Sequence, residues 1–253
     1  MSDIERATQA LAKAKAVVAA TGAGMSKESG IPTFRDALDG LWAHYNPEEL
    51  ATRDGFRSNP ARVWGWYNYR RGLIAATSPH AGHEALARLE TSIPEFIVVT
   101  QNIDDMHRRA GSQRILELHG NINRFKCFEH DHPVDDMDVP LADTDGPLDP
   151  PTCARCGSPV RPDVVWFGEM LPPGVFEESE RRSVSCDVMI VVGTSGLVYP
   201  AAALPAVARG AGAAIIEINT EPSEITRFAN IFLQGPAGQI LPEIVSKTET
   251  EQP

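Results

Sequence analysis

The stretch AVVAATGAG (residues 16–24) joins a run of small and β-branched apolar residues directly to a Gly-x-Gly turn. An apolar run without polar alternation is typical of a strand that is buried on both faces of a parallel sheet. Gly22 and Gly24 permit a tight turn and a close approach of the backbone to a phosphate at a helix amino terminus. A Gly-x-Gly alone is equally compatible with a turn that binds nothing. The stretch therefore predicts a buried strand followed by a candidate phosphate loop.

Three further runs repeat this pattern, and each passes from β-branched residues into Gly, Thr, Asn or Asp. They are FIVVTQNID (96–104), CDVMIVVGTSG (186–196) and AAIIEINTE (213–221). Helical patterns lie between them, for example at residues 83–90 and 200–210. Strands that alternate with helices predict an α/β fold: a Rossmann-like doubly wound parallel sheet that binds ligands at the carboxyl ends of its strands.

Two segments interrupt this alternation. Residues 36–80 have a helical pattern, and residues 121–162 hold three of the four cysteines and a long acidic, proline-rich loop that we expect to be exposed. We predict that 36–80 and 121–162 form a smaller lobe, with a helical module and a zinc module. Residues 1–35, 81–120 and 163–253 would form the Rossmann-like domain.

The composition excludes several classes of protein. With 34 acidic and 23 basic residues the formal charge is −11, which argues against non-specific binding of nucleic acid. No apolar run approaches the ~18 residues of a membrane span, and the acidic amino terminus resembles neither a signal nor a transit peptide. We expect a soluble cytoplasmic protein without nucleic-acid or membrane partners. No oligomerisation helix is evident, so a monomer is compatible with the sequence.

The stretch GAGMSKESGIPTFR (22–35) closely resembles the NAD-binding loop of the sirtuins, which are NAD-dependent protein lysine deacylases. Further matches follow in the order of that family: TQNID (100–104), LHGN (118–121), VVWFGE (164–169), VVGTS (191–195) and INTE (218–221). The resemblance extends from about residue 21 to residue 238. An oxidoreductase fits less well, because the dehydrogenase fingerprint requires a third glycine where this chain has Lys27.

The resemblance implies NAD as co-substrate and assigns its binding residues. They are Gly22, Ala23, Gly24, Phe34, Arg35, Gln101, Asn102, Asp104, Gly193, Thr194, Ser195, Asn219, Glu221 and Ala237. It also implies that His119 is the general base that takes a proton from a ribose hydroxyl, with Asn102 as a second catalytic residue. In the implied reaction the acyl oxygen of an acyl-lysine attacks C1′ of the nicotinamide ribose. The products are nicotinamide, O-acyl-ADP-ribose and free lysine.

An acyl-lysine protein or peptide is the implied partner. VVWFGE resembles the peptide-binding strand of the family, where a substrate backbone pairs by β-augmentation. Tyr67-Asn68-Tyr69-Arg70 matches the Tyr-x-x-Arg of sirtuins that remove succinyl, malonyl and glutaryl groups, and Ala51 matches a small residue that widens their acyl pocket. Tyr67 and Arg70 share one helix face, where a guanidinium and a phenol can bind a carboxylate. The implied substrate residues are Ala51, Tyr67, Arg70, Val165, Trp166, Phe167 and Gly168.

Several alternatives remain open at this point. If Arg70 only pairs with a surface carboxylate, the protein would be a general lysine deacetylase. An NAD glycohydrolase or ADP-ribosyltransferase would use the same NAD residues but would need neither Tyr67 nor Arg70. A non-enzymatic zinc-ribbon adaptor would consume no NAD.

The cysteines suggest a structural zinc site. Cys153 and Cys156 form a Cys-x-x-Cys pair, and Cys127 precedes the pair by 26 positions. The family has a second Cys pair, but here His130 stands where the fourth cysteine is expected, which predicts a Cys₃His site. His132 is a nearby substitute ligand, and a degenerate site without metal is the alternative.

Overall fold

The computed structural model describes residues 1–33, 45–134 and 139–251. Its centre is a six-stranded sheet in the order β3-β2-β1-β6-β7-β8, in which all neighbouring strands run parallel. The strands are β1 (Ala16–Thr21), β2 (Glu95–Thr100), β3 (Ile115–Glu117), β6 (Val188–Val192), β7 (Ala214–Asn219) and β8 (Ile231–Gln234). Strand β1 pairs with β2 on one side and with β6 on the other, so the strand order reverses at β1. This is the predicted doubly wound sheet, and a reversal of this kind leaves a crevice for ligands.

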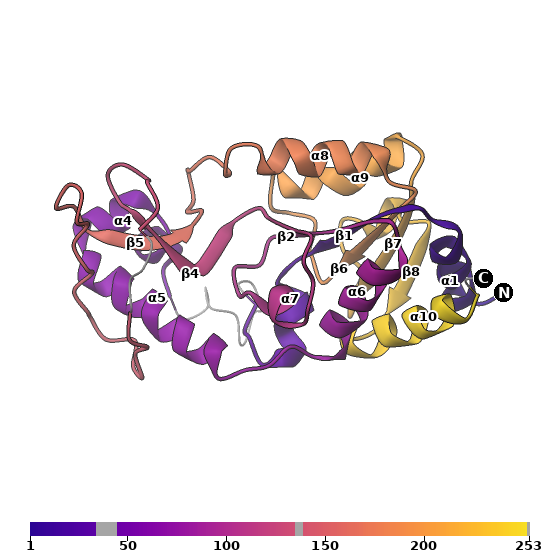
Figure 1. Cartoon of the computed structure of the whole chain (residues 1–253), viewed down its shortest axis with the longest axis horizontal. Coiled ribbons are helices and arrows are strands. Elements are labelled where there is room, and N and C mark those ends of the chain that lie inside the picture. Colours follow the sequence, from indigo (N-terminus) through magenta and orange to yellow (C-terminus); the bar gives the residue numbers. More distant parts are fainter. Residues whose placement is uncertain (34–44, 135–138, 252–253) are drawn as a thin grey trace.

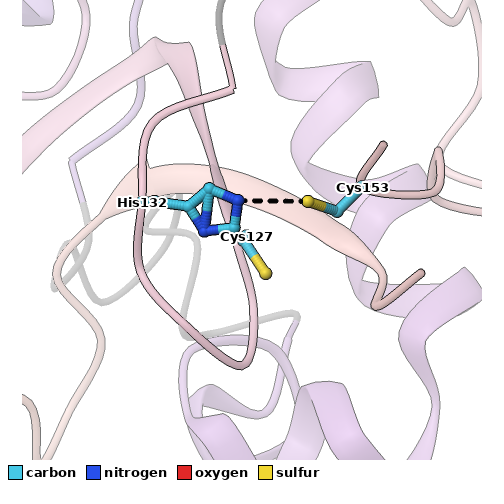
Figure 2. Close-up of side chains that lie close together, drawn as sticks. All are labelled: Cys127, His132 and Cys153. Atoms are coloured by element: carbon cyan, nitrogen blue, oxygen red, sulfur yellow. Dashed lines mark hydrogen bonds between the residues drawn. The ribbon is translucent and has the colours of Figure 1, made fainter. Parts of the chain in front are cut away.

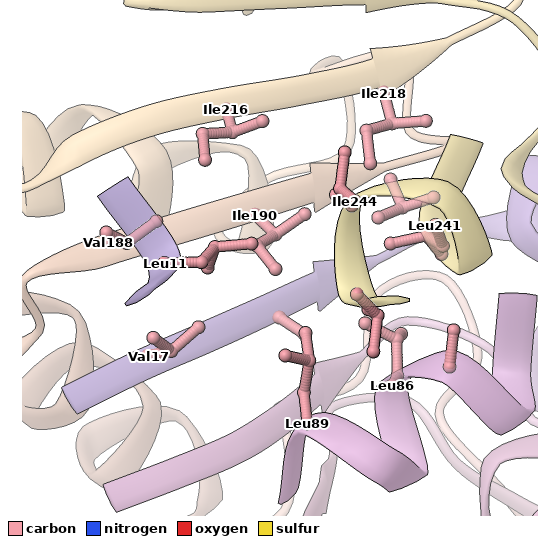
Figure 3. Packing of buried hydrophobic residues seen from close by; sticks show 14 of the residues in the cluster. Leu11, Val17, Leu86, Leu89, Val188, Ile190, Ile216, Ile218, Leu241 and Ile244 are labelled. Atoms are coloured by element: carbon pink, nitrogen blue, oxygen red, sulfur yellow. The ribbon is translucent and has the colours of Figure 1, made fainter. Parts of the chain in front are cut away.

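Helices cover both faces of the sheet (Figure 1). Helices α1 (Asp3–Lys13), α6 (Ala81–Ser92) and α10 (Ala237–Glu251) pack on one face, where Leu11, Leu86 and Leu241 contact the strands (Figure 3). Helices α8 (Val175–Ser185) and α9 (Leu204–Gly210) cover the other face. Successive residues of β1 alternate between the two cores, because Val17 belongs to the first and Val18 to the second. This explains why the first strand is apolar from Ala16 to Ala20.

Short elements complete the sheet domain. They are η1 (Ala23–Ser29), α7 (Met106–Arg109), η2 (Ala201–Ala203) and η3 (Thr226–Phe228). Within the described ranges, no helix is both long and apolar enough to cross a membrane.

A second group of elements lies at the opposite end of the molecule from the termini (Figure 1). It contains α3 (Pro47–Leu50), α4 (Arg53–Ser58), α5 (Pro60–Ala75) and the antiparallel strands β4 (Gly120–Cys127) and β5 (Val160–Val164). These elements share an aromatic core that includes Phe56, Trp64 and Trp166. The sequence pattern predicted the helices but not the two-stranded sheet.

Helix α5 carries the aromatic segment, and its start is well defined. The side chain of Asn59 accepts a hydrogen bond from the N–H of Arg62, and Pro60 occupies the first turn. In residues 139–150, the part of the acidic loop that the structure describes after its gap, most side chains are exposed. Its backbone is tied to α5, because Leu148 N–H donates to the Ala61 carbonyl at 2.9 Å and Asn68 donates to the Pro140 carbonyl at 2.6 Å.

Candidate active site

A cavity of about 920 Å³ opens at the carboxyl ends of the central strands, and both groups of elements line it. Its volume is large enough for a cofactor together with part of a substrate. It brings together most of the residues that the sequence predicted as a site. These are Gly22, Ala23, Gly24, Ala51, Tyr67, Arg70, Gln101, Asn102, His119, Val165, Trp166, Phe167, Gly168, Gly193, Thr194, Ser195, Asn219 and Glu221.

Two predicted cofactor residues do not line this cavity. Asp104 is 5 % exposed and lies behind its wall, where the carboxylate accepts a hydrogen bond from the N–H of Met106 at the start of α7. Ala237 is buried at the first position of α10. The predicted contacts of these two residues with NAD stay predictions. Phe34 and Arg35 lie outside the described residues.

The glycines of the first loop are required by close packing of two backbones. A Cβ atom on Gly24 would lie 2.8 Å from Cα of Gly193, and one on Gly22 would lie 2.9 Å from the Gly193 carbonyl oxygen. Gly193 itself has φ 59° and would place a Cβ 2.3 Å from the Met25 nitrogen. The loops after β1 and β6 thus meet without side chains between them, and together they form the floor of the cavity.

Asn102 and Gln101 follow β2 and connect these loops. The Asn102 amide donates from Nδ2 to the Gly22 carbonyl at 3.0 Å and to Ser26 Oγ at 3.2 Å. Gln101 Nε2 donates to Thr194 Oγ1 at 3.3 Å, and Asn219 Nδ2 donates to the Thr194 carbonyl at 3.0 Å. These contacts join the ends of β1, β2, β6 and β7 into one polar wall.

His119 stands between β3 and β4, and its surroundings favour the neutral imidazole. Its Nδ1 lies 2.9 Å from the Gln101 carbonyl oxygen, which can only accept, so Nδ1 carries the proton. Burial lowers the pKa of His119 below its ordinary value, and the hydrogen bond to Gln101 opposes this only in part. At neutral pH the other nitrogen, Nε2, is therefore unprotonated. A histidine in this state can act as a general base toward a group in the cavity.

Tyr67, Arg70 and Ala51 line the cavity from the second group of elements, Ala51 at the end of α3 and the other two on α5. Tyr67 is 4 % exposed and Arg70 is 6 % exposed, and both lie on α5. The guanidinium carbon of Arg70 lies 4.7 Å from the Trp66 ring centroid and 5.8 Å from that of Tyr67. Burial raises the pKa of Tyr67, so its phenol keeps its proton at neutral pH. Burial also lowers the pKa of Arg70, which Tyr67 and Asp104 oppose.

The segment predicted as a peptide-binding strand is not a strand. Strand β5 ends at Val164, and the next residues form a turn. The N–H groups of this turn are used inside the chain: Val165 donates to the His119 carbonyl, Phe167 to the Ala51 carbonyl, and Trp166 to Glu169. A substrate backbone would therefore have to pair with other backbone groups of this segment, and its role in binding peptide stays a prediction.

Comparisons with known proteins agree with this geometry. The model of the Sir2 family matches residues 22–200. The chain belongs to the Sir2 family. A relative from Pseudomonas putida, named NAD-dependent protein deacylase, is 44% identical over 98% of this chain and 95% of its own length. One from Pyrobaculum aerophilum, named NAD-dependent protein deacylase 2, is 47% identical over 94% of this chain and 93% of its own.

Solved structures of Sir2 homologues share the fold and bind the expected ligands. A mutant of one homologue in complex with ADP-ribose has a TM-score of 0.89 at 41% identity, covering 99% of this chain and 97% of its own. Another, Sir2Af2, is bound to a myristoylated histone peptide and has a TM-score of 0.76 at 34% identity, covering 98% and 97%. This Sir2-family chain is therefore an NAD-dependent enzyme.

The cysteines predicted to bind zinc lie at the aromatic core of the second group of elements, and none of them lines the cavity. Ligand atoms of Cys127, His132 and Cys153 lie within 4.8 Å of one another, and His132 Nε2 is 3.3 Å from Cys153 Sγ (Figure 2). Cys156 Sγ lies 3.4 Å from Cys127 Sγ. Hydrogen bonds from Ser158 lower the pKa of Cys156 to about 7, which favours the thiolate. Three thiols and one imidazole suit tetrahedral Zn²⁺, so these residues could hold a structural zinc ion.

The histidine in this group is His132, whereas the sequence spacing pointed to His130. Asp131 has φ 51°, and the N–H of Cys127 donates to the His132 carbonyl at 3.0 Å. This tight turn places residue 132 opposite residue 127 and leaves His130 exposed at the turn. The Cys-x-x-Cys spacing of the family predicts a ligand at position 130 and takes no account of this turn. The signal in the sequence for the alternative ligand was the second histidine, His132.

Sequence reasoning also missed Ser26 and the apolar wall of the cavity. Ser26 is 1 % exposed and its hydroxyl accepts from Asn102, so it orders the residues behind the wall. Its place within the matched loop sequence was the available signal. The apolar wall includes Leu171 and Phe176, from a segment without a motif, and Leu197, which directly follows the predicted GTSG stretch.

Proposed function

We propose that this member of the Sir2 family is an NAD-dependent protein lysine deacylase that prefers acidic acyl groups, such as succinyl, malonyl and glutaryl. The observation that carries the preference is the buried pair of Tyr67 and Arg70 at the wall of the cavity. The reaction would give nicotinamide, O-acyl-ADP-ribose and free lysine.

NAD would bind along the polar wall between the strand ends. Gly22, Gly24 and Gly193 let the loops after β1 and β6 meet at the floor of the cavity, along which the phosphates would lie, while Gln101 and Asn102 stand at the end nearer His119. Asn219 and Glu221 extend the wall toward the other end of the cavity, where ribose hydroxyls would find acceptors. The acyl-lysine would enter from the side of the small group of elements, along residues 165–168.

His119 would act as the general base. Its proton on Nδ1 is committed to the Gln101 carbonyl, so Nε2 accepts the proton of a ribose hydroxyl without any change of tautomer. The lowered pKa of His119 keeps this nitrogen free below neutral pH. The same hydrogen bond fixes the plane of the ring, which positions the base.

The acidic acyl group would be read by Arg70 and Tyr67. Burial of a carboxylate is costly unless a cation and hydrogen-bond donors compensate it. A guanidinium presents two parallel donors to a carboxylate, and a neutral phenol adds one more. Ala51, which is 6 % exposed in the same wall, leaves room for the acyl chain. An acetyl group would reach neither donor and would gain nothing from them.

The experiment is a comparison of kcat/KM on one peptide that carries acetyl-lysine or succinyl-lysine, with NAD present. Deacylated peptide and nicotinamide are followed in the same reaction. We expect a preference of at least about tenfold for succinyl-lysine, since one hydrogen bond to a charged group is worth about 1.5–3 kcal/mol. Equal turnover would identify a general deacetylase. Release of nicotinamide without deacylated peptide would identify an NAD glycohydrolase or ADP-ribosyltransferase.

A further inference from the structure

A buried hydrogen bond joins Trp166 to Tyr67 across the wall of the cavity. The indole Nε1–H of Trp166 donates to the hydroxyl oxygen of Tyr67 at 3.0 Å. Trp166 is 2 % exposed and Tyr67 is 4 % exposed, so water does not compete for this contact. The two residues are 99 positions apart in the chain, and the bond links α5 to the turn after β5.

This bond determines how the phenol can be used. An indole N–H is a donor only, so Tyr67 must receive it on a lone pair of its oxygen. The single proton of the phenol is then left for another acceptor. Within residues 1–33, 45–134 and 139–251, no hydrogen bond donated by the Tyr67 hydroxyl is found. Tyr67 lines the cavity next to Arg70, so an acceptor on a bound acyl group can take that proton.

The indole is itself held in place on two sides. The backbone N–H of Trp166 donates to Glu169 Oε2 at 2.8 Å, and the guanidinium carbon of Arg161 lies 3.3 Å from the centroid of the Trp166 ring. Arg161 and Glu169 form a bidentate pair at 2.5 Å and 2.9 Å. Burial alone would raise the pKa of Glu169, but the hydrogen bonds and charge of Arg161 lower it, so the pair stays ionised. Trp166 therefore presents its N–H in a fixed position.

We propose that Trp166 is a positioning residue for acyl-group selection: by occupying a lone pair of the Tyr67 oxygen, it directs the phenol proton, beside Arg70, toward the carboxylate of an acidic acyl group. This inference rests on the proposed preference for acidic acyl groups. It assigns to Trp166 a role through Tyr67 that is separate from any contact of the 165–168 segment with the peptide.

The test is a double-mutant cycle of Trp166→Phe and Tyr67→Phe, with succinyl-lysine and acetyl-lysine on the same peptide. In Trp166→Phe we expect the ratio of succinyl to acetyl kcat/KM to fall about threefold to tenfold, the effect of one neutral hydrogen bond, mainly through KM for the succinyl peptide. In the Tyr67→Phe background, Trp166→Phe should lower that ratio no further, because its effect passes through the phenol.

Trp64→Phe is the matched control. Trp64 is also 2 % exposed and belongs to the same aromatic core, where its ring centroid lies 5.5 Å from that of Phe125. It does not line the cavity. It should leave the succinyl to acetyl ratio unchanged. If Trp166→Phe fails to fold, site-specific replacement of Trp166 by β-(3-benzothienyl)alanine keeps the shape of the indole and removes only the N–H.

The outcomes separate this inference from the proposed function. A wild-type enzyme without preference for succinyl-lysine overturns both. If the wild type prefers succinyl-lysine but Trp166→Phe lowers kcat/KM for both substrates equally, only the role of Trp166 is overturned. The same holds if the effects of Trp166→Phe and Tyr67→Phe on the succinyl to acetyl ratio are additive. A ratio that falls in Trp166→Phe, stays constant in Trp64→Phe and shows no additivity with Tyr67→Phe establishes it.

Discussion

Replacement of Arg70 by methionine removes the charge that we assign to acyl recognition while keeping an unbranched side chain of similar length. The methionine can retain packing on the face of Trp66, where the guanidinium carbon of Arg70 lies 4.7 Å from the ring centroid. The change should therefore spare most of the aromatic core.

The expected magnitude follows from the burial of the site. Arg70 is 6 % exposed, so a carboxylate bound beside it would be largely removed from water. Truncation of one partner of a buried, hydrogen-bonded charge pair costs about 2–4 kcal/mol, which corresponds to about 30- to 900-fold in kcat/KM for succinyl-lysine. Burial raises the pKa of Asp104 and Arg70 opposes that rise, so Arg70→Met also brings Asp104 closer to protonation. That second effect is common to both substrates, and the acetyl-lysine rate measures it.

The assay is kcat/KM with NAD on matched succinyl-lysine and acetyl-lysine peptides, and Arg71→Met serves as control. Arg71 is the next residue on α5, is half-buried, and donates to Asn68 Oδ1 at 2.8 Å, but it does not line the cavity. Arg71→Met should leave the ratio of the two rates unchanged. Equal losses on both substrates in Arg70→Met would refute the reasoning and make Arg70 a structural residue.

Three further predictions concern the base, the metal lobe and the acid stability of the fold. His119→Ala should abolish deacylation while the circular dichroism spectrum remains native, and turnover by this variant would disprove the assignment of the base. Because burial lowers the pKa of His119, the acidic limb of the pH profile of wild-type kcat/KM should have its midpoint below about pH 6.5. The purified protein should contain about one equivalent of zinc by metal analysis, and Cys153→Ser should lower both zinc content and Tm, since structural zinc sites contribute to folding; less than about half an equivalent in the wild type would favour a degenerate site. Burial lowers the pKa of His83 to about 2 and that of His107 to about 3. Below about pH 6.5 the unfolded chain therefore binds more protons at these histidines than the folded chain does. As the pH falls, the free energy of unfolding should decrease by up to about 1.4 kcal/mol per pH unit for each histidine. Urea unfolding between pH 7 and 4.5 tests this, and a slope that His107→Gln does not reduce would contradict it.

The sheet and the cofactor end of the cavity could be predicted from local sequence. Strands buried on both faces of a parallel sheet favour continuous apolar runs, as in β1, where Val17 and Val18 pack into opposite cores. The polar residues that follow such strands meet at one edge of the sheet. For this reason Gln101, Thr194 and Asn219 were placed correctly in the cavity wall.

The sequence by itself thus determined the doubly wound fold, the family and the edge of the sheet where the cavity lies, because these depend on periodicity and on residues next to one another in the chain. The tertiary structure decided three features that the sequence did not predict. It placed Asp104 behind the wall, it selected His132 over His130 through a turn at Asp131, and it joined Trp166 to Tyr67. Each of these depends on the direction in which a side chain points, which residue type and spacing along the chain do not encode.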